Sequence, residues 1–209
     1  MKCPAGSRKR ERPGDAVESY ANDVLAGSVD SGFSGAGYKT RWGMNLSNFE
    51  FERHSNPVDM IEFVAAANDW TFERSGEHEI AMTVEGHWTD YHVSFSWMED
   101  CEALHIASAF DIKVPDVRVT EVMKLLSHVN GQVLMGHFDL WQQEHVVIFR
   151  QSLLLAGGAE PTNRQVEVLL SNALDSCEAY FQAFQFVVWS GMDAKSAITA
   201  VMFETRGEA

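Results

Sequence analysis

The sequence predicts an α+β fold in which an antiparallel sheet packs against helices. The strongest evidence is residues 79–110, three short runs of alternating polarity separated by Glu85-Gly86 and by the acidic turn at residues 99–102. Successive side chains of a strand point to opposite faces, so each run can bury one face and expose the other. Short connections between such runs favour an antiparallel meander. Segments with helical spacing flank the meander without strict alternation, which is not the order of a parallel, doubly wound sheet.

The first half of the domain begins with a helix. Asn56-Pro57 has the pattern of an N-cap followed by proline at the first helical position, and the helix is predicted to reach about Asn68. A strand begins at Trp70 and turns at Ser75-Gly76 into the meander. After the meander, apolar residues at helical spacing predict a second helix that ends at Asn130-Gly131.

The second half predicts another hairpin, from residues 135–141 and 145–155. The apolar run of residues 146–149 is typical of a central strand that is covered on both faces. Thr162 and Gln165 have the spacing of a capping box, and a long helix is predicted from there to about residue 189. A short last helix follows at residues 194–203. The predicted order is therefore α-β-β-β-β-α-β-β-α-α.

The domain is predicted to span residues 56–206, after a mostly disordered N-terminal arm of residues 1–55. Within the arm, residues 27–37 have the glycine- and serine-rich composition of a flexible linker. Residues 42–51 are more apolar, and we expect that they could dock on the domain or on a partner.

The charge of the chain is unevenly distributed. The formal net charge is -14; residues 1–56 hold eight Lys/Arg and seven Asp/Glu, whereas the remainder holds eight and twenty-three. Such an acidic body repels phosphate backbones and anionic lipid surfaces, so neither nucleic acid nor a membrane is an expected partner. No secretory signal is recognisable at the N-terminus, which makes the cytoplasm the expected location.

No motif in the sequence predicts catalysis, a cofactor or a metal site. Cys3, Cys101 and Cys177 lie far apart, which argues against a disulfide framework and against a CxxC site. Cys101 lies in a turn among carboxylates, which raise the pKa of a thiol and make it a poor nucleophile. We therefore expect no enzymatic activity.

Three histidines, His92, His105 and His137, lie in predicted strands on the side opposite most of the large apolar residues. If their strands were adjacent and in register, the three imidazoles could approach one metal ion. Their spacing matches no known ligand pattern, so solvated or hydrogen-bonded surface histidines are the simpler interpretation.

The second half of the long helix, residues 180–189, is apolar nearly all round, as buried helices are. One sheet cannot cover every side of such a helix, so we expect a second copy of the chain or another polypeptide to contribute. Phe181, Phe184 and Trp189 are the candidates for this partner or dimer surface. The alternative is that they pack within the core of a single chain.

Three stretches of the sequence resemble the YbjN family, whose members are often labelled bacterial sensory transduction regulators. The resemblance covers residues 56–204 and includes Asn130, Gly136, Phe138, Arg150 and Gly158. The stretches are PVDMIEFVAAANDW, KVPDVRVTEVMKLLSHVNGQVLMGHFDLW and VVIFRQSLLLAGGAEPT. The resemblance implies a fold similar to that of type III secretion chaperones, which are small dimeric α+β domains that hold other polypeptides and have no catalytic residues.

We therefore expect a non-enzymatic protein-interaction module, chaperone-like or regulatory, that binds another polypeptide and itself as a dimer. The alternative is a small-molecule or metal-binding protein, with or without enzymatic activity, that uses a pocket between the sheet and the helices. A deep pocket with convergent polar groups would favour the alternative, and a shallow apolar groove would favour the interaction module.

Overall fold

A computed structural model describes residues 55–204, with side chains to residue 202, so the expectations for the N-terminal arm lie outside the described residues. The order of elements in the described part agrees with the predicted one, and the α+β class is confirmed. The helices are α2 (Pro57–Ala67), α3 (Asp116–Asn130), α4 (Asn163–Val188) and α5 (Ala194–Glu204), with a short 3-10 turn η1 (Glu99–Cys101). The strands are β1 (Phe72–Arg74), β2 (Glu79–Glu85), β3 (Asp90–Met98), β4 (Ala103–Lys113), β5 (His137–Trp141) and β6 (Val146–Leu154).

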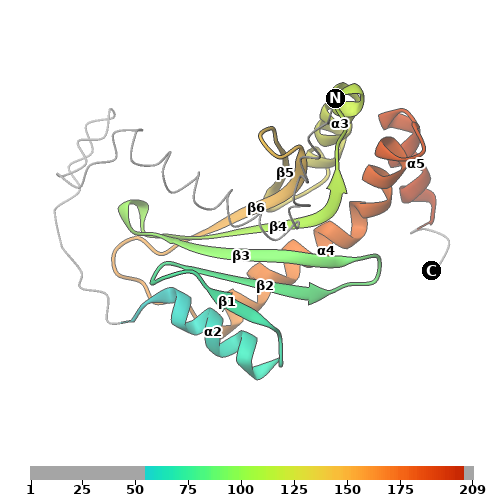
Figure 1. Cartoon of the computed structure of the whole chain (residues 1–209). Coiled ribbons are helices and arrows are strands. Elements are labelled where there is room, and N and C mark those ends of the chain that lie inside the picture. The colour runs from blue at the N-terminus through green and yellow to red at the C-terminus, as the bar shows by residue number, and fades with distance from the viewer. Residues whose placement is uncertain (1–54, 205–209) are drawn as a thin grey trace, which may run out of the picture.

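The strands form one antiparallel sheet in the order β1-β2-β3-β4-β6-β5. β4 and β6 are neighbours although α3 and β5 separate them in the chain, so the second hairpin extends the sheet that the meander begins. The sheet is long and curved, and α4 runs along one side of it (Figure 1). The interpretation of residues 146–149 as part of a central strand is confirmed, because all four side chains are buried and β6 lies between β4 and β5.

The helix-covered face of the sheet holds the main core. Phe110 on β4 contacts Phe181 and Phe184 on α4, with ring centroids 5.4 and 5.6 Å apart. Phe138 on β5 contacts Phe184 at 5.5 Å and Phe149 on β6 at 5.2 Å. These aromatic residues join the long helix to strands on both halves of the sheet. Contacts between aromatic rings stabilise a fold by more than the burial of their surface area alone.

The apolar circumference of α4 is covered within the single chain. Its second half packs on β4 and β6 on one side and on α3 and α5 on the other. Phe181 and Phe184 are 4% and 0% exposed, so they belong to the core and are not accessible to a partner. The interpretation of these two residues as an external surface is therefore corrected. The sequence pattern shows that these two residues must be covered. It does not show whether another subunit or two other helices of the same chain, here α3 and α5, cover them.

Helix ends follow the sequence signals. The Asn56 side chain accepts a hydrogen bond from the Val58 backbone N–H at 3.0 Å, as an N-cap does. Thr162 and Gln165 form the predicted capping box, with the Thr162 N–H donating to Gln165 Oε1 at 2.8 Å. Within residues 55–204, no helix combines the length and the apolar character needed to cross a membrane.

The outer edge of β5 is closed by side chains. Asn130, at the end of α3, donates from Nδ2 to the Phe138 carbonyl at 2.9 Å and accepts from the Phe138 N–H at 2.7 Å. The next outward-facing N–H, that of Leu140, donates to Asp139 Oδ1 at 2.8 Å. Asn130 thus supplies the pair of hydrogen bonds that a further strand would supply, and the edge cannot readily pair with another chain.

Replacing Asn130 with alanine should destabilise the fold by about 1–3 kcal/mol, because it leaves the partly buried backbone groups of Phe138 without a partner. Urea unfolding of Asn130→Ala against wild type measures this. Gln143→Ala, in the exposed turn between β5 and β6, is the control and should change little. Equal stability of Asn130→Ala and wild type would show that the side chain does not close the edge.

Candidate functional site

The face of the sheet opposite the helices is built in cross-strand rows that follow from the register. One row reads Glu79, Ser96, His105 and Ser152 across β2, β3, β4 and β6. The next row along the strands reads Ala81, Ser94, Ala107, Arg150 and His137. On this face Arg150 and His137 lie side by side on β6 and β5, and His105 lies on β4 in the neighbouring row. Serine and alanine occupy most of the remaining positions of the two rows.

β6 is longer than its outer neighbour. The pairing of β5 with β6 begins at His137 opposite Arg150, so residues 151–154 extend past the start of β5. On the inner side, the same four residues remain paired with β4. Within the described residues, one edge of β6 is therefore open over the length of four residues.

The register shows which backbone groups face this open edge. Because Asn130 takes the N–H and C=O of Phe138, these groups point away from β6, and His137 and Arg150 form the hydrogen-bonded pair. Backbone groups alternate along a strand, so those of Ser152 and Leu154 point to the same side as those of Arg150. The Leu155 N–H donates to the Glu102 carbonyl at 2.7 Å on the β4 side, which agrees with this alternation. Ser152 and Leu154 are both exposed, Leu154 at 73%.

Both ends of the open edge are held in place. At one end, Gly136 has a φ of +78°, and a Cβ there would lie 2.8 Å from the Arg150 carbonyl and 2.3 Å from the Phe149 ring, so only glycine fits. Asn172 on α4 fixes the same loop by donating to the Met135 carbonyl at 3.2 Å and to Gln151 Oε1 at 2.7 Å. At the other end, the Glu102 carboxylate accepts from the Gly157 N–H at 2.8 Å and from the Gly158 N–H at 3.3 Å.

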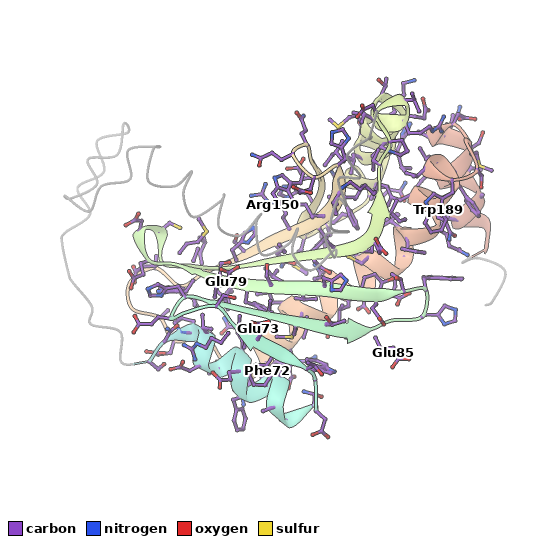
Figure 2. The ribbon with its side chains drawn as sticks, viewed as in Figure 1. Phe72, Glu73, Glu79, Glu85, Arg150 and Trp189 are labelled. Carbon is purple, nitrogen blue, oxygen red and sulfur yellow. The ribbon has the colours of Figure 1, made fainter. Side chains whose placement is uncertain are left out.

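A cavity of about 460 Å³ lies beside this edge. It is lined by His105, Met135, Gly136, His137, Arg150, Gln151 and Ser152. Arg150 projects from the β6 region of the sheet, well away from Trp189 at the end of α4 (Figure 2). The Arg150 guanidinium lies 3.3 Å from Asp139 Oδ2. In an otherwise acidic body, the cavity concentrates one arginine and two histidines and can attract an anionic group.

The His105 imidazole lies at the inner wall of the cavity and is 6% exposed. Burial, with smaller effects from the nearby Arg150 and His137, lowers its pKa to about 4. His105 is therefore neutral at physiological pH and acts there as a hydrogen-bonding group and not as a charge.

The three histidines do not converge on one point. His105 is opposite Ser96 and Ser152, whereas His92 is opposite Ala109 and accompanies Thr83, whose Oγ1 is 3.3 Å from His92 Nδ1. Four residues of β4 separate these positions, which is about 13 Å along a strand. Arg150 occupies the position between His105 and His137. Among the described side chains, no group of three His, Cys, Asp or Glu residues is placed to hold a metal ion.

The two described cysteines have thiols of raised pKa. For Cys101 the main cause is burial, with a contribution from Asp100, which agrees in direction with the expectation of a poor nucleophile. Cys177 is fully buried in the core beside Ser108, and burial raises its pKa to about 12. Cys3 lies outside the described residues.

Of the three residues predicted for a partner surface, only Trp189 is exposed, at 58%. It follows the last residue of α4, beside the connection to α5. Arg118 on α3 holds this connection by donating to the Val187 carbonyl at 2.8 Å and to the Met192 carbonyl at 2.7 Å. Val117, the neighbour of Arg118, is 86% exposed. Trp189 and Val117 thus stand at the same end of the helical layer.

The open edge of β6 was not foreseen from the sequence. The predicted arms of the second hairpin, residues 135–141 and 145–155, already differed in length, but no register between them could be read from the sequence. The signal for the difference is Gly136, since a glycine at the start of a strand pattern often marks a turn or a close backbone approach.

Acidification should destabilise the protein through His105. Its pKa is near 6.5 in the unfolded chain and about 4 in the folded one, so the unfolded state binds the proton more readily between these values. Stability is complete above pH 6.5 and is lost as the pH falls toward 4; the loss from pH 7.5 to pH 5 is about 2 kcal/mol.

Urea unfolding at the two pH values, for wild type and His105→Gln, measures this loss, and the variant should lose much less. His128→Gln, on the exposed side of α3, is the control and should behave as wild type does. Glu121 and Asp193 have pKa values lowered by hydrogen bonds from the Ala194 N–H and from Ser196, so they titrate below the range used. An identical loss in His105→Gln and wild type would exclude the His105 contribution.

Comparison with known proteins identifies the family. The model of the YbjN family, described as "Putative bacterial sensory transduction regulator", matches residues 57–186, which is more than half of the chain. Among solved structures, the chain is similar to a crystal structure of YbjN from E. coli, described there as a putative transcription regulator, with a TM-score of 0.44 and 12% identity. That similarity covers 58% of this chain and 85% of the other. None of the curated proteins matches. The chain belongs to the YbjN family.

Proposed function

We propose that this chain is a non-enzymatic regulatory module of the cytoplasm that binds another polypeptide as an added strand on the open edge of β6. The observation that supports this most strongly is the overhang of residues 151–154, where the backbone groups of Ser152 and Leu154 face no strand within the described residues. An extended peptide can pair with such an edge through its main chain. The family description, a sensory transduction regulator, agrees with a role exerted through binding.

The surroundings of the edge indicate the chemistry of the partner. Arg150, His105 and His137 lie on one side of it, and Arg150 supplies positive charge at neutral pH. The exposed side chains of Leu134, Met135 and Leu154 supply apolar surface around it. An extended segment that carries both acidic and apolar residues fits this combination, because charge aids encounter and buried apolar side chains add affinity.

Replacing Ser152 with proline should abolish binding of such a peptide and leave the fold intact. Proline removes one N–H, and at this position that N–H faces the open edge and not β4. Binding of fluorescent acidic peptides rich in Val, Ile and Leu, followed by polarisation, measures the effect; we expect at least a tenfold loss of affinity, about 1.4 kcal/mol.

The matched control is Ser152→Ala, which changes the same side chain and keeps the backbone donor. It should bind as wild type does. Comparable binding by Ser152→Pro and Ser152→Ala would contradict strand addition at this edge, provided that circular dichroism shows both variants folded.

We also propose that the chain forms a dimer through the end of α4. Trp189 and Val117 provide exposed apolar surface there, and tryptophan is the residue type most often found at energetically important interface positions. Phe181 and Phe184 are buried in the core, so Trp189 is the one of the three candidates left to contact a partner copy.

Light scattering after size exclusion tests the dimer. Wild type should show twice the chain mass at high concentration, and Trp189→Lys should shift to the monomer mass, because a charge would be buried in the interface. Trp88→Lys, which alters another exposed tryptophan in the turn between β2 and β3, is the control and should remain dimeric. A wild-type protein that is strictly monomeric at high concentration would refute the dimer.

A second candidate function is the binding of an anionic small molecule in the cavity beside β6. Its support is the gathering of Arg150, His105 and His137 around about 460 Å³. The cavity opens at the sheet edge and not between the sheet and the helices, which differs from the site expected from the sequence. Arg150→Gln should weaken the binding of a small anion, whereas Ser152→Pro should leave it unchanged. The two variants therefore distinguish anion binding from peptide binding.

The functional unit that we propose is residues 56–206, preceded by the arm of residues 1–55. The family match ends at residue 186, but Ala197, Ile198 and Val201 of α5 contribute to the main core. α5 therefore belongs to the same folding unit as the matched region.

A further inference from the structure

The two ends of the open edge of β6 differ in shape. At one end β5 begins, with His137 opposite Arg150, and the backbone of Gly136 lies against β6, since a Cβ on it would be 2.8 Å from the Arg150 carbonyl. At the other end, the Gly157 N–H donates to the Glu102 carboxylate, so the chain that follows β6 turns toward the start of β4 and away from the edge. Within the described residues, an added strand therefore meets a stop only where β5 begins.

The register sets the place of this stop. Because His137 is opposite Arg150, Gly136 stands opposite Gln151, and an added strand can occupy the positions opposite Ser152, Leu153 and Leu154. Its residue nearest β5 forms a hydrogen-bonded pair with Ser152. A chain that continued past this residue would have to turn out of the sheet, whereas a chain that ends there needs no turn. The edge therefore suits the end of a polypeptide.

Charge at the stop shows which end of a polypeptide fits. An added strand that is antiparallel to β6, as every other pair in this sheet is, has its carboxyl end at the stop, whereas a parallel strand would have its amino end there. The cavity of about 460 Å³ lies at the stop, because Gly136, His137, Arg150 and Ser152 all line it. Arg150 is positively charged, and none of the described lining residues is Asp or Glu. This lining favours a carboxylate over an ammonium group.

We propose that the partner binds through its free C-terminus. Its last three residues form a strand antiparallel to β6, and its terminal carboxylate lies in the cavity beside Arg150. The proposal rests on strand addition at the open edge and names the part of the partner that occupies it. Capture of a terminal carboxylate is a recurring mode of peptide recognition, because every chain end carries the charge whatever its sequence.

The faces of β6 indicate the preceding residues of the partner. The Gln151 side chain accepts from Asn172 on α4, so Leu153, two residues along, lies on the same, helix-covered face, where it packs against the main core. The partner's second-last side chain lies beside Leu153. Its third-last side chain lies on the other face beside Leu154, which is exposed. Apolar residues at these two positions of the partner would cover apolar surface on both faces.

Three fluorescent peptides test the terminus on the wild-type protein. All carry Gly-Ser-Gly-Ile-Val-Ser; one ends there as a free acid, one ends there as an amide, and one continues with Gly-Ser-Gly and ends as an amide. Polarisation should show that the free acid binds about tenfold tighter or more than the other two, because only it places a charge beside Arg150. Equal affinities, or no binding of the free acid, would overturn the proposal.

Two arginine variants locate the carboxylate. Arg150→Gln should lower the affinity for the free acid to that for the amide and should change the affinity for the amide little. Arg164→Gln is the matched control, because it removes the same charge from an exposed side chain at the start of α4. It should keep the wild-type preference. A full preference for the free acid in Arg150→Gln would contradict the proposed position of the carboxylate.

Ser152→Pro separates this proposal from strand addition itself. If the edge pairs with the peptides, this variant should lose all three. Equal binding of the three peptides by wild type and their common loss in Ser152→Pro would support strand addition and refute recognition of the terminus. Binding of the free acid by Ser152→Pro as tightly as by wild type would show that the carboxylate is held without strand pairing, which contradicts both proposals.

Discussion

The pairing of β4 with β6 is the interaction on which the rest of the structure depends. Both strands are central: β4 is buried on both faces over most of its length, and β6 is buried on both faces over residues 146–149. A strand that is buried on both faces requires a layer on each side. One layer is α4, which is held in turn by α3 and α5; the apolar circumference of α4 follows from its position between the sheet and these helices.

The edges of the sheet differ in how well they are protected from pairing with another chain. β1 has only three residues, and β5 is closed by the side chains of Asn130 and Asp139. Both devices discourage pairing with other chains. The overhang of β6 has no such closure among the described residues and is instead held rigid by Gly136 and Glu102. An edge that is fixed in place and left open, in a protein that closes its other edges, is better explained by use than by chance.

Local signals in the sequence predicted the elements and their order, because capping residues and polarity patterns act over a few residues. Asn56, Thr162 and Gln165 are examples in which the predicted hydrogen bonds are present. Properties that depend on tertiary contacts were harder to predict. Phe181 and Phe184 have the same pattern whether α3 and α5 or another subunit covers them, and the sequence could not decide between the two.

The candidate site illustrates the same limit. His105 and Arg150 come together only because β4 and β6 are neighbours, and their register cannot be read from either strand alone. His92 lies on the same face but several residues farther along the strands. The sequence could therefore predict that the three histidines share a face, but not how far apart they lie. The open edge depends on where β5 begins, which Asn172 and Gly136 determine through contacts with β6 and its neighbouring loop.

Amide hydrogen exchange along β6 tests the central claim most directly. In the free protein, the amides of Ser152 and Leu154 should exchange rapidly, while those of Gln151 and Leu153, which face β4, should be protected. A bound peptide partner should slow exchange at Ser152 and Leu154 and leave their neighbours unchanged. Equal protection of all four amides in the free protein, or no change at Ser152 and Leu154 when the partner is bound, would contradict the account.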